Sequence, residues 1–260
     1  MFDTLLARWK QGHRTMRYPA GPAPELPERF AGRPTVDATR CTTACRQCAE
    51  VCPTGAVSAA PDGEPLAIDL GRCLFCRQCE TTCPTGVIRF TRDHRLAASQ
   101  RGDLVVRSAA QQAAVALDQA ARRLFGHSLR LRQVSAGGCN ACEADTNVLG
   151  TLAWDLGRFG IQFVASPRHA DGLLVTGPVS ENMRLAIQKT YDVVPTPKLV
   201  IAVGACAISG GPYADHPETA GGVAGLLPVD LFVPGCPPHP LTILDGLLRL
   251  LGREVEEGPR

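Results

Sequence analysis

The stretch that decides the fold of the first half of this chain reads Cys73-Leu-Phe-Cys76-Arg-Gln-Cys79-Glu-Thr-Thr-Cys83-Pro84. Its spacing, C-x2-C-x2-C-x3-C-P, is the run that ligates cubane iron-sulfur clusters. Where a chain carries two such clusters, the first three cysteines bind one of them and the fourth binds the other. The proline after the fourth cysteine turns the chain away. The run therefore predicts a region built around a pair of [4Fe-4S] clusters.

A similar run precedes it and reads Cys41-Thr-Thr-Ala-Cys45-Arg-Gln-Cys48-Ala-Glu-Val-Cys52-Pro53. Thr-Gly and two apolar residues follow both runs, at 54–57 and 85–88, which indicates an internal duplication. Cross-ligation then assigns Cys41, Cys45, Cys48 and Cys83 to cluster 1, and Cys52, Cys73, Cys76 and Cys79 to cluster 2. The first run has one extra residue between its first two cysteines, which leaves a three-iron or labile first cluster as the alternative.

Zinc and disulfides are the other uses of clustered cysteines. Residues 1–17 lack the apolar core and cleavage site of a signal peptide, so we expect a cytoplasmic chain whose thiols stay reduced. Structural zinc usually takes pairs of ligands separated by a longer loop, and nothing here supplies the histidine of a mixed site. We therefore expect iron-sulfur clusters rather than zinc or disulfides.

The second half alternates short apolar runs with helical patterns, which predicts an open α/β sheet. We expect strands over 129–134, 161–164, 172–175, 199–203 and 229–233, and helices over 143–156, 180–191 and 241–251. The last four cysteines lie just after three of these strands. Ligands of open α/β sheets bind at the carboxyl ends of the strands. We therefore predict a third [4Fe-4S] cluster, with glycines beside its ligands, on Cys139, Cys142, Cys206 and Cys236.

The remaining segments connect and dock these parts. Residues 1–17 predict an amphipathic helix with a basic face, which suits docking to a partner subunit, with a membrane surface as the alternative. The proline-rich segment 18–36 predicts an extended strap. Residues 108–125 favour a helix, with Gly126 as its cap. The predicted division is a helix and strap over 1–36, a two-cluster domain over 37–93, a helical linker over 94–127 and an α/β domain over 128–260.

Composition excludes several other classes of function. Lys and Arg number 27 and Asp and Glu 25, so the net charge of +2 gives no overall field for binding nucleic acid. No apolar run approaches the roughly 18 residues of a transmembrane helix. Gly-x-Gly-x-x-Gly and Walker-type loops are absent, so any flavin or nicotinamide nucleotide is expected on a partner.

Longer motifs carry a family resemblance. The segments Gly137-Gly138-Cys139-Asn140, 166–171 and Pro234-Gly235-Cys236-Pro237-Pro238 resemble the small subunit of membrane-bound [NiFe] hydrogenases of the formate hydrogenlyase type. They are also similar to the 20 kDa subunit of respiratory complex I. Residues 1–107 resemble the two-cluster ferredoxin subunit of the same hydrogenases, so the chain looks like a fusion of both. The resemblance implies a bacterial 2[4Fe-4S] ferredoxin-like domain joined by a helix to a flavodoxin-like open α/β domain.

The resemblance implies an electron-transfer subunit in which three [4Fe-4S] clusters form a wire. Catalysis would belong to a large hydrogenase-like subunit at the third cluster, and an electron donor or acceptor protein would meet the ferredoxin domain. Membrane subunits would hold the chain peripherally on the cytoplasmic face. The spacing Cys139-x2-Cys142 favours the hydrogenase branch, because complex I subunits place the corresponding two cysteines side by side. A complex I-like quinone or ferredoxin oxidoreductase module without nickel is the alternative, and a free-standing soluble ferredoxin is a third.

Four further residues have candidate roles. Glu143 is expected to support a cluster ligand or to lie at a subunit interface, with a proton carrier as the alternative. Asp145 stands where the family often has glutamate, so its carboxylate has a shorter reach. His169 is expected to be a structural hydrogen-bonding residue. His239 is expected in a surface loop, with a hydrogen bond to a cluster sulfur as the alternative.

Overall fold

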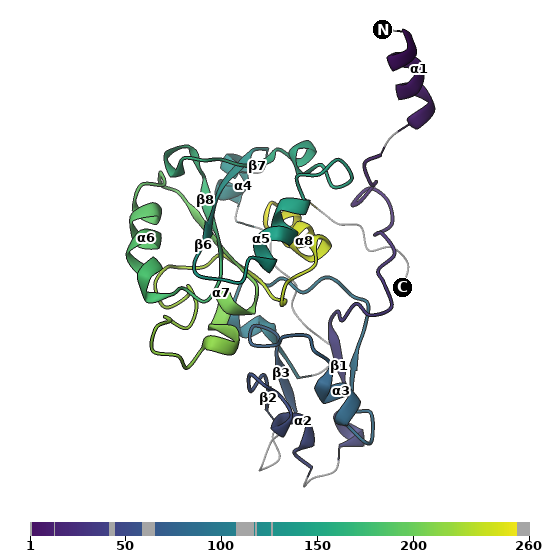
Figure 1. Cartoon of the computed structure of the whole chain (residues 1–260), viewed down its shortest axis with the longest axis vertical. Coiled ribbons are helices and arrows are strands. Elements are labelled where there is room, and N and C mark those ends of the chain that lie inside the picture. The colour runs from purple at the N-terminus through teal and green to yellow at the C-terminus, as the bar shows by residue number, and fades with distance from the viewer. Residues whose placement is uncertain are drawn as a thin grey trace.

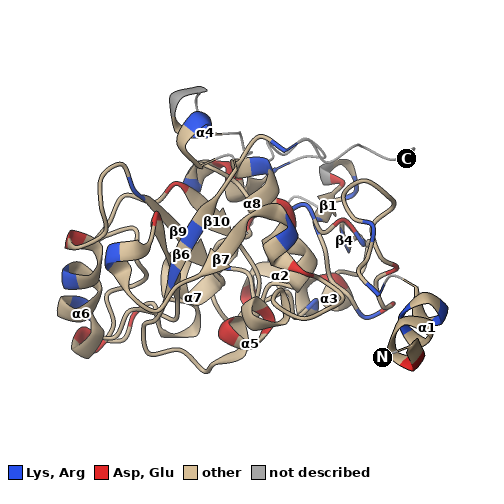
Figure 2. Ribbon diagram, turned by 90° about the horizontal axis from the view of Figure 1, so that it is seen from above, with Lys and Arg blue, Asp and Glu red and all other residues tan. Residues whose placement is uncertain are grey.

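The computed structural model describes residues 2–12, 14–41, 45–58, 66–107, 117, 119–125 and 127–253 (Figure 1). An N-terminal region with two small antiparallel sheets lies against a C-terminal region with one parallel sheet. Lys, Arg, Asp and Glu are distributed over both regions (Figure 2). Within the described ranges, no helix is both long and apolar enough to cross a membrane.

The C-terminal region is built on five parallel strands in the order β10-β9-β8-β6-β7. They are β6 (Leu129–Ser135), β7 (Ile161–Phe163), β8 (Gly172–Thr176), β9 (Leu199–Val203) and β10 (Leu231–Val233). Numbered by their place in the chain, they follow the order 2-1-3-4-5, which is the flavodoxin-like arrangement. The predicted open α/β fold is confirmed. Its strand order reverses between β6 and β8, which makes that edge the natural ligand site.

Helices cover both faces of this sheet (Figure 1). The core on one face joins the sheet to the helices α4 (Gln119–Phe125), α5 (Ala141–Val148) and α8 (Pro240–Leu250). The core on the other face includes residues of α6 (Glu181–Asp192) and α7 (Ala205–Ser209). Every residue of β8 and β9 is buried, as expected for strands covered on both sides. The 3-10 turns of this region are η3 (Leu156–Phe159), η4 (Pro167–His169) and η5 (Gly211–Tyr213).

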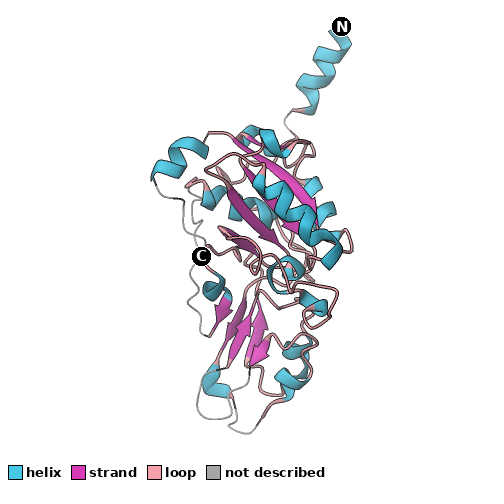
Figure 3. Ribbon diagram, turned by 90° about the vertical axis from the view of Figure 1, so that its left-hand side faces the viewer, coloured by secondary structure: helices cyan, strands magenta, loops and turns pink. Residues whose placement is uncertain are grey.

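The N-terminal region consists of short strands and two short helices that contact each other (Figure 3). One sheet pairs β1 (Pro34–Val36) with β4 (Ile88–Phe90). The other pairs β2 (Val57–Ser58), β3 (Ala67–Asp69) and β5 (Val105–Val106). The helices are α2 (Gln47–Glu50) and α3 (Gln78–Thr82), and the 3-10 turns are η1 (Ala38–Arg40) and η2 (Arg101–Leu104).

The two regions share one hydrophobic core and backbone contacts. Buried residues of β3 and β5 belong to the same apolar cluster as those of α6, α7 and β8. Ala98 forms an antiparallel bridge with Phe232 through hydrogen bonds of 3.0 and 2.8 Å. The hydroxyl of Ser209 donates to the carbonyl of Gly71 at 2.8 Å. These contacts fix the N-terminal region against the edge of the parallel sheet.

Some elements are shorter than the sequence predicts. The opening helix α1 (Phe2–Gln11) ends before Gly12, whose φ of +61° suits a residue that terminates a helix. The helix expected over 143–156 ends at Val148, where the Thr151 hydroxyl donates to the Val148 carbonyl at 2.7 Å. In the predicted linker the described residues form η2, β5 and α4. Residues 108–116, 118 and 126 of that linker lie outside the described residues.

Candidate iron-sulfur sites

The structure gathers Cys41, Cys45, Cys48 and Cys83 around one cavity, which Leu66, Thr85, Val87 and Ile88 help to line. Burial raises the pKa of Cys48, and the neighbouring thiols of the other three cysteines raise it further. Cys41 is exposed at the outer edge. These four residues, here called the first set, come from both cysteine runs.

A second set of four thiols has two buried members, Cys73 and Cys79. Burial raises the pKa of Cys73 to about 12, opposed by a hydrogen bond from the Phe75 N–H at 3.3 Å. Cys79, Cys52 and Cys76 surround Cys73 closely enough to raise its pKa as well. The second set therefore consists of Cys52, Cys73, Cys76 and Cys79, again drawn from both runs.

In each duplicated Thr-Gly segment, backbone and side-chain groups lie within hydrogen-bonding range of one cysteine sulfur. The backbone N–H of Ala56 donates to Cys52 Sγ at 3.2 Å, and that of Val87 donates to Cys83 Sγ at 3.4 Å. The hydroxyls of Thr54 and Thr85 lie 3.9 and 3.7 Å from the same two sulfurs. Such donors favour the thiolate form and tune a bound cluster. The duplicated sequence therefore gives Cys52 and Cys83 the same pattern of hydrogen-bond donors.

The third set lies at the carboxyl edge of the parallel sheet. Cys139 and Cys142 follow β6, Cys206 lies in α7 after β9, and Cys236 follows β10. Burial raises the pKa of Cys142 to about 12, and Cys206, Glu143, Cys236 and Cys139 contribute to that shift. Cys139 and Cys236 are exposed. Four cysteines that follow three strands therefore meet where the fold places its ligands.

Two glycines make room for the third set. Gly204 has a φ of +92°, and a Cβ added there would lie 2.5 Å from Cys142 Sγ. Gly211 has a φ of +54°, and its Cβ would lie 2.9 Å from Cys206 Sγ. Any larger residue would fill the space around these sulfurs. Glycine at these two positions therefore lets the Cys142 and Cys206 sulfurs lie against the backbone at this edge.

Electrostatic interactions between cysteines of different sets indicate which sets are adjacent. Cys48 of the first set contributes to the raised pKa of Cys79 in the second. Cys76 of the second set contributes to the raised pKa of Cys236 in the third. Cys48 and Cys79, and likewise Cys76 and Cys236, are therefore near enough to interact electrostatically across neighbouring sets.

Within the described ranges, no group of three or more His, Cys, Asp or Glu side chains is arranged to hold a single metal ion. A cubane is bound differently, because each thiolate binds a separate iron at a corner of a larger body. Each set supplies four thiols for that mode of binding. The backbone N–H donors and the close approach of Gly204 and Gly211 are compatible with it. Each thiol must lose its proton to become a ligand, so cluster binding would release protons.

The two carboxylates near the third set differ in environment. Burial raises the pKa of Glu143, but hydrogen bonds from Ser135 and Thr176 outweigh it and leave that pKa lowered. The Thr176 hydroxyl at the end of β8 donates to Glu143 Oε1 at 2.6 Å. Burial raises the pKa of Asp145. Glu143 therefore joins α5 to β8 beside Cys142.

The two histidines singled out by the sequence lie in different settings. His169 is exposed in η4. His239 caps α8 by accepting a hydrogen bond from the Leu241 N–H at 3.1 Å, and its ring packs edge-on against Phe30 and Trp154. Burial and the neighbouring His94 lower the pKa of His239. His239 is thus a packed helix cap rather than part of a free surface loop.

A polar network that sequence reasoning missed fastens the strap to α8. The Tyr18 hydroxyl donates to Asp245 Oδ1 at 2.9 Å and lies 3.4 Å from His94 Nε2. Arg249 Nε donates to Asp245 Oδ2 at 3.0 Å. Burial lowers the pKa of His94, which favours its neutral form. The pair Asp245 and Arg249 has the i, i+4 spacing of a helical ion pair, but no spacing signal joins it to Tyr18 and His94, which lie far away in the chain.

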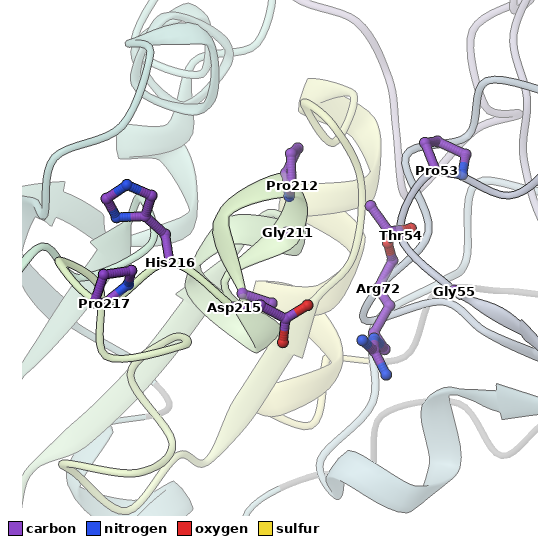
Figure 4. A pocket seen from close by; sticks show the side chains of 10 residues that line it. Pro53, Thr54, Gly55, Arg72, Gly211, Pro212, Asp215, His216 and Pro217 are labelled. Carbon is purple, nitrogen blue, oxygen red and sulfur yellow. Dashed lines mark hydrogen bonds between the residues drawn. The ribbon is translucent and has the colours of Figure 1, made fainter.

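A cleft separates the second set from a loop of the C-terminal region (Figure 4). Thr54 and Arg72 line one side, and Asp215 and His216 line the other. The cleft is completed by Pro53, Gly55, Gly211, Pro212, Ala214 and Pro217. The Thr54 hydroxyl donates to the Arg72 carbonyl at 2.7 Å, which fixes that wall. The cleft is polar and stands next to the loop that carries Cys52.

Two family models match this chain. "NADH ubiquinone oxidoreductase, 20 Kd subunit" covers residues 139–250, and "4Fe-4S dicluster domain" covers residues 40–87. The second match confirms iron-sulfur cluster binding by the N-terminal region at the level of the domain.

Three curated relatives align with the C-terminal half. A probable membrane-bound hydrogenase subunit of Pyrococcus furiosus is 42% identical over 50% of this chain and 77% of its own length. An NADH-quinone oxidoreductase subunit of Clostridium beijerinckii is 44% identical over 44% of this chain and 68% of its own. Formate hydrogenlyase subunit 7 of Escherichia coli is 43% identical over 46% of this chain and 47% of its own. The predicted resemblance to hydrogenase and complex I subunits is confirmed, and the chain belongs to the NADH ubiquinone oxidoreductase 20 kDa subunit family, preceded here by a 4Fe-4S dicluster domain.

Proposed function

We propose that this chain is the iron-sulfur electron-transfer subunit of a membrane-associated [NiFe] hydrogenase-like complex of the formate hydrogenlyase type. It would pass electrons through three [4Fe-4S] clusters to or from a large catalytic subunit. The observation that carries the proposal is the gathering of all twelve cysteines into three neighbouring sets of four.

Each set would supply four thiolate ligands to one cluster, so the first, second and third sets would hold clusters 1, 2 and 3. A bound [4Fe-4S] cluster supplies one-electron redox chemistry. The electrostatic interactions of Cys48 with Cys79 and of Cys76 with Cys236 support this order of the sites. The backbone N–H groups that donate to the Sγ atoms of Cys52, Cys73 and Cys83 would stabilise the negative charge that these sulfurs would share with a cluster.

The proposed domain limits follow this division of roles. Residues 37–93 would form the two-cluster domain and residues 128–260 the single-cluster domain. The segments 1–36 and 94–127 would dock and connect them. The strap supports its docking role through buried Tyr18 and Leu26, which pack into the core beside α8.

Partners would meet the two ends of this series of sites. Cys139 and Cys236 are exposed at one end, where a large catalytic subunit would cover them. Cys41 is exposed at the other, where an electron donor or acceptor protein would approach. Membrane subunits of the complex would hold the assembly on the cytoplasmic face.

A complex I-like module without nickel is the second candidate, favoured by the 44% identity to the NADH-quinone oxidoreductase subunit of Clostridium beijerinckii. Nickel distinguishes the two. We expect nickel in the complex isolated anaerobically by an affinity tag on this chain. A catalytically active complex with iron but no nickel would favour the second candidate.

Replacement of one ligand at the exit end tests the assignment. We expect Cys206→Ser to remove the signal of cluster 3 in low-temperature electron paramagnetic resonance and to abolish turnover of the complex. The two signals of the N-terminal region should remain, because their ligands come from other residues. Cys41→Ser is the reciprocal variant and should change the first signal while leaving the third. Unchanged turnover of Cys206→Ser would overturn the role of the third set.

A further inference from the structure

The turn that leads into Cys73 is fixed within the N-terminal region. The backbone N–H of Cys73 donates to the Asp69 carbonyl at 3.0 Å, and the N–H of Gly71 donates to Asp69 Oδ1 at 2.9 Å. Arg101 holds the same carboxylate through two hydrogen bonds of 2.8 and 2.6 Å. Gly71 is buried in this turn. Its backbone is therefore held in place two residues before a cysteine of the second set.

Gly71 is also the point at which this turn meets α7. The Ser209 hydroxyl donates to the Gly71 carbonyl at 2.8 Å, and it lies 3.1 Å from the Ala205 carbonyl of its own helix. A Cβ on Gly71 would lie 2.8 Å from Ile208 Cγ2 and 2.8 Å from Arg101 Cζ. Glycine is therefore needed for the turn to approach α7 this closely. We call Gly71 and Ser209 the clamp.

The helix α7 connects the clamp to the third set and lies at the boundary of the two regions (Figure 1). Cys206 belongs to the same helix, three residues before Ser209. The N–H of Ala205, at the start of the helix, donates to the carbonyl of Gly235, the residue before Cys236. One short helix therefore joins the turn beside the second set to two cysteines of the third.

A second backbone contact between the two regions acts elsewhere. The bridge of Ala98 and Phe232 joins β10 to a segment that carries no cysteine. That bridge orients the regions as a whole. The clamp instead acts between two segments that carry cysteines, so it determines how closely those cysteines approach each other.

We propose that Gly71 and Ser209 are positioning residues that set the separation of the second and third sets, and with it the rate of electron transfer between the clusters that these sets would hold. The inference rests on the proposed function, because it assigns the spacing of two sites in the same series. Electron tunnelling falls steeply with distance, so a small displacement of α7 from the turn slows it. Close packing resists such a displacement, because the protein interior has few voids to absorb it.

Two variants disturb the clamp in different ways. Ser209→Ala removes the hydroxyl, and Gly71→Ala inserts a methyl group between the turn and α7. In the cluster-loaded full chain, reduced without oxygen, we expect both variants to weaken the magnetic interaction between the second and third clusters in electron paramagnetic resonance. This interaction falls with the cube of the distance. The interaction between the first and second clusters should stay unchanged, because both would lie within the N-terminal region.

Amide hydrogen exchange of α7 is a second readout that needs no paramagnet. We expect exchange there to become about two- to tenfold faster in Ser209→Ala, the effect of losing one hydrogen bond. Ser58→Ala is a matched control, because it removes a hydroxyl that donates to the Ala67 carbonyl within the N-terminal region. Gly102→Ala is the other, because a Cβ there meets nothing within 4 Å. Both controls should behave like the unaltered chain in both measurements.

The outcomes separate the clamp from the clusters themselves. Full iron content with an unchanged interaction between the second and third clusters in Ser209→Ala would overturn the proposal. A weakened interaction in the clamp variants, but not in the controls, would support it. If Gly71→Ala does not fold, Ser209→Ala decides alone. Missing clusters in the unaltered chain would be a failure of the proposed function, and unchanged exchange of α7 in Ser209→Ala would then still overturn the clamp.

Discussion

At the scale of single residues, the sites depend on small side chains as much as on cysteines. Gly204 follows β9 with a φ of +92°, a conformation that disfavours every residue with a Cβ. Its hypothetical Cβ would lie 2.5 Å from Cys142 Sγ, well inside contact distance. The backbone therefore approaches that sulfur in a way that only glycine permits.

We expect Gly204→Ala to impair the third site without unfolding the N-terminal region. The added methyl group would displace Cys142 Sγ, so iron content should fall by about four atoms per chain, the content of one cubane. Gly225→Ala is the matched control, because a Cβ there meets nothing within 4 Å. Full iron content in Gly204→Ala would show that the third site tolerates a Cβ at this position.

The sequence contains a signal for the membership of the sets but little for their surroundings. Cys73, Cys76 and Cys79 are close in the chain, so their spacing alone brings them together. The grouping of Cys206 with Cys139 followed from the rule that ligands meet at the carboxyl edge of parallel strands. The approach of Gly211 to Cys206 could not be predicted, because it depends on how the chain turns back after α7. The ligand roles themselves remain predictions.

At the scale of elements, the strap and α8 form a joint through Tyr18, His94, Asp245 and Arg249. Asp245 is only 1% exposed, so its carboxylate needs the donors that Tyr18 and Arg249 supply. Arg158 adds a hydrogen bond to the Tyr18 carbonyl at 2.6 Å. The strap is therefore held by polar contacts as well as by apolar packing.

We expect Tyr18→Phe to loosen this joint by about 1–3 kcal/mol, because it removes one donor from a buried carboxylate. Amide hydrogen exchange of residues 16–20 and of α8 measures the change as faster exchange. Tyr213→Phe is the control, since Tyr213 is exposed. Unchanged protection in Tyr18→Phe would mean that apolar packing alone fixes the strap.

Elements with a clear period in their apolar residues were predictable from the sequence. Elements of two or three residues were not. The strand β9 and the helices α6 and α8 occur within one or two residues of their predicted positions, because their apolar pattern extends over several residues. The strands β1 to β5 have two or three residues each, too few to show an alternating pattern. Their positions follow from the wrapping of the chain around the cysteine sets rather than from propensity.

At the scale of the whole molecule, contacts between the two regions decide which cysteine sets are neighbours. The shared core and the bridge between Ala98 and Phe232 hold the N-terminal region so that Cys76 neighbours Cys236. The sequence implied a fusion of two parts but contained no signal for this orientation. Packing between distant segments decides which set faces which.

The metal content of the intact chain distinguishes three clusters from two. Iron and acid-labile sulfide should be measured per chain in protein purified without oxygen. Three cubanes predict about twelve atoms of each. About eight of each would contradict a third cluster, because only the pair of clusters in the N-terminal region would then remain.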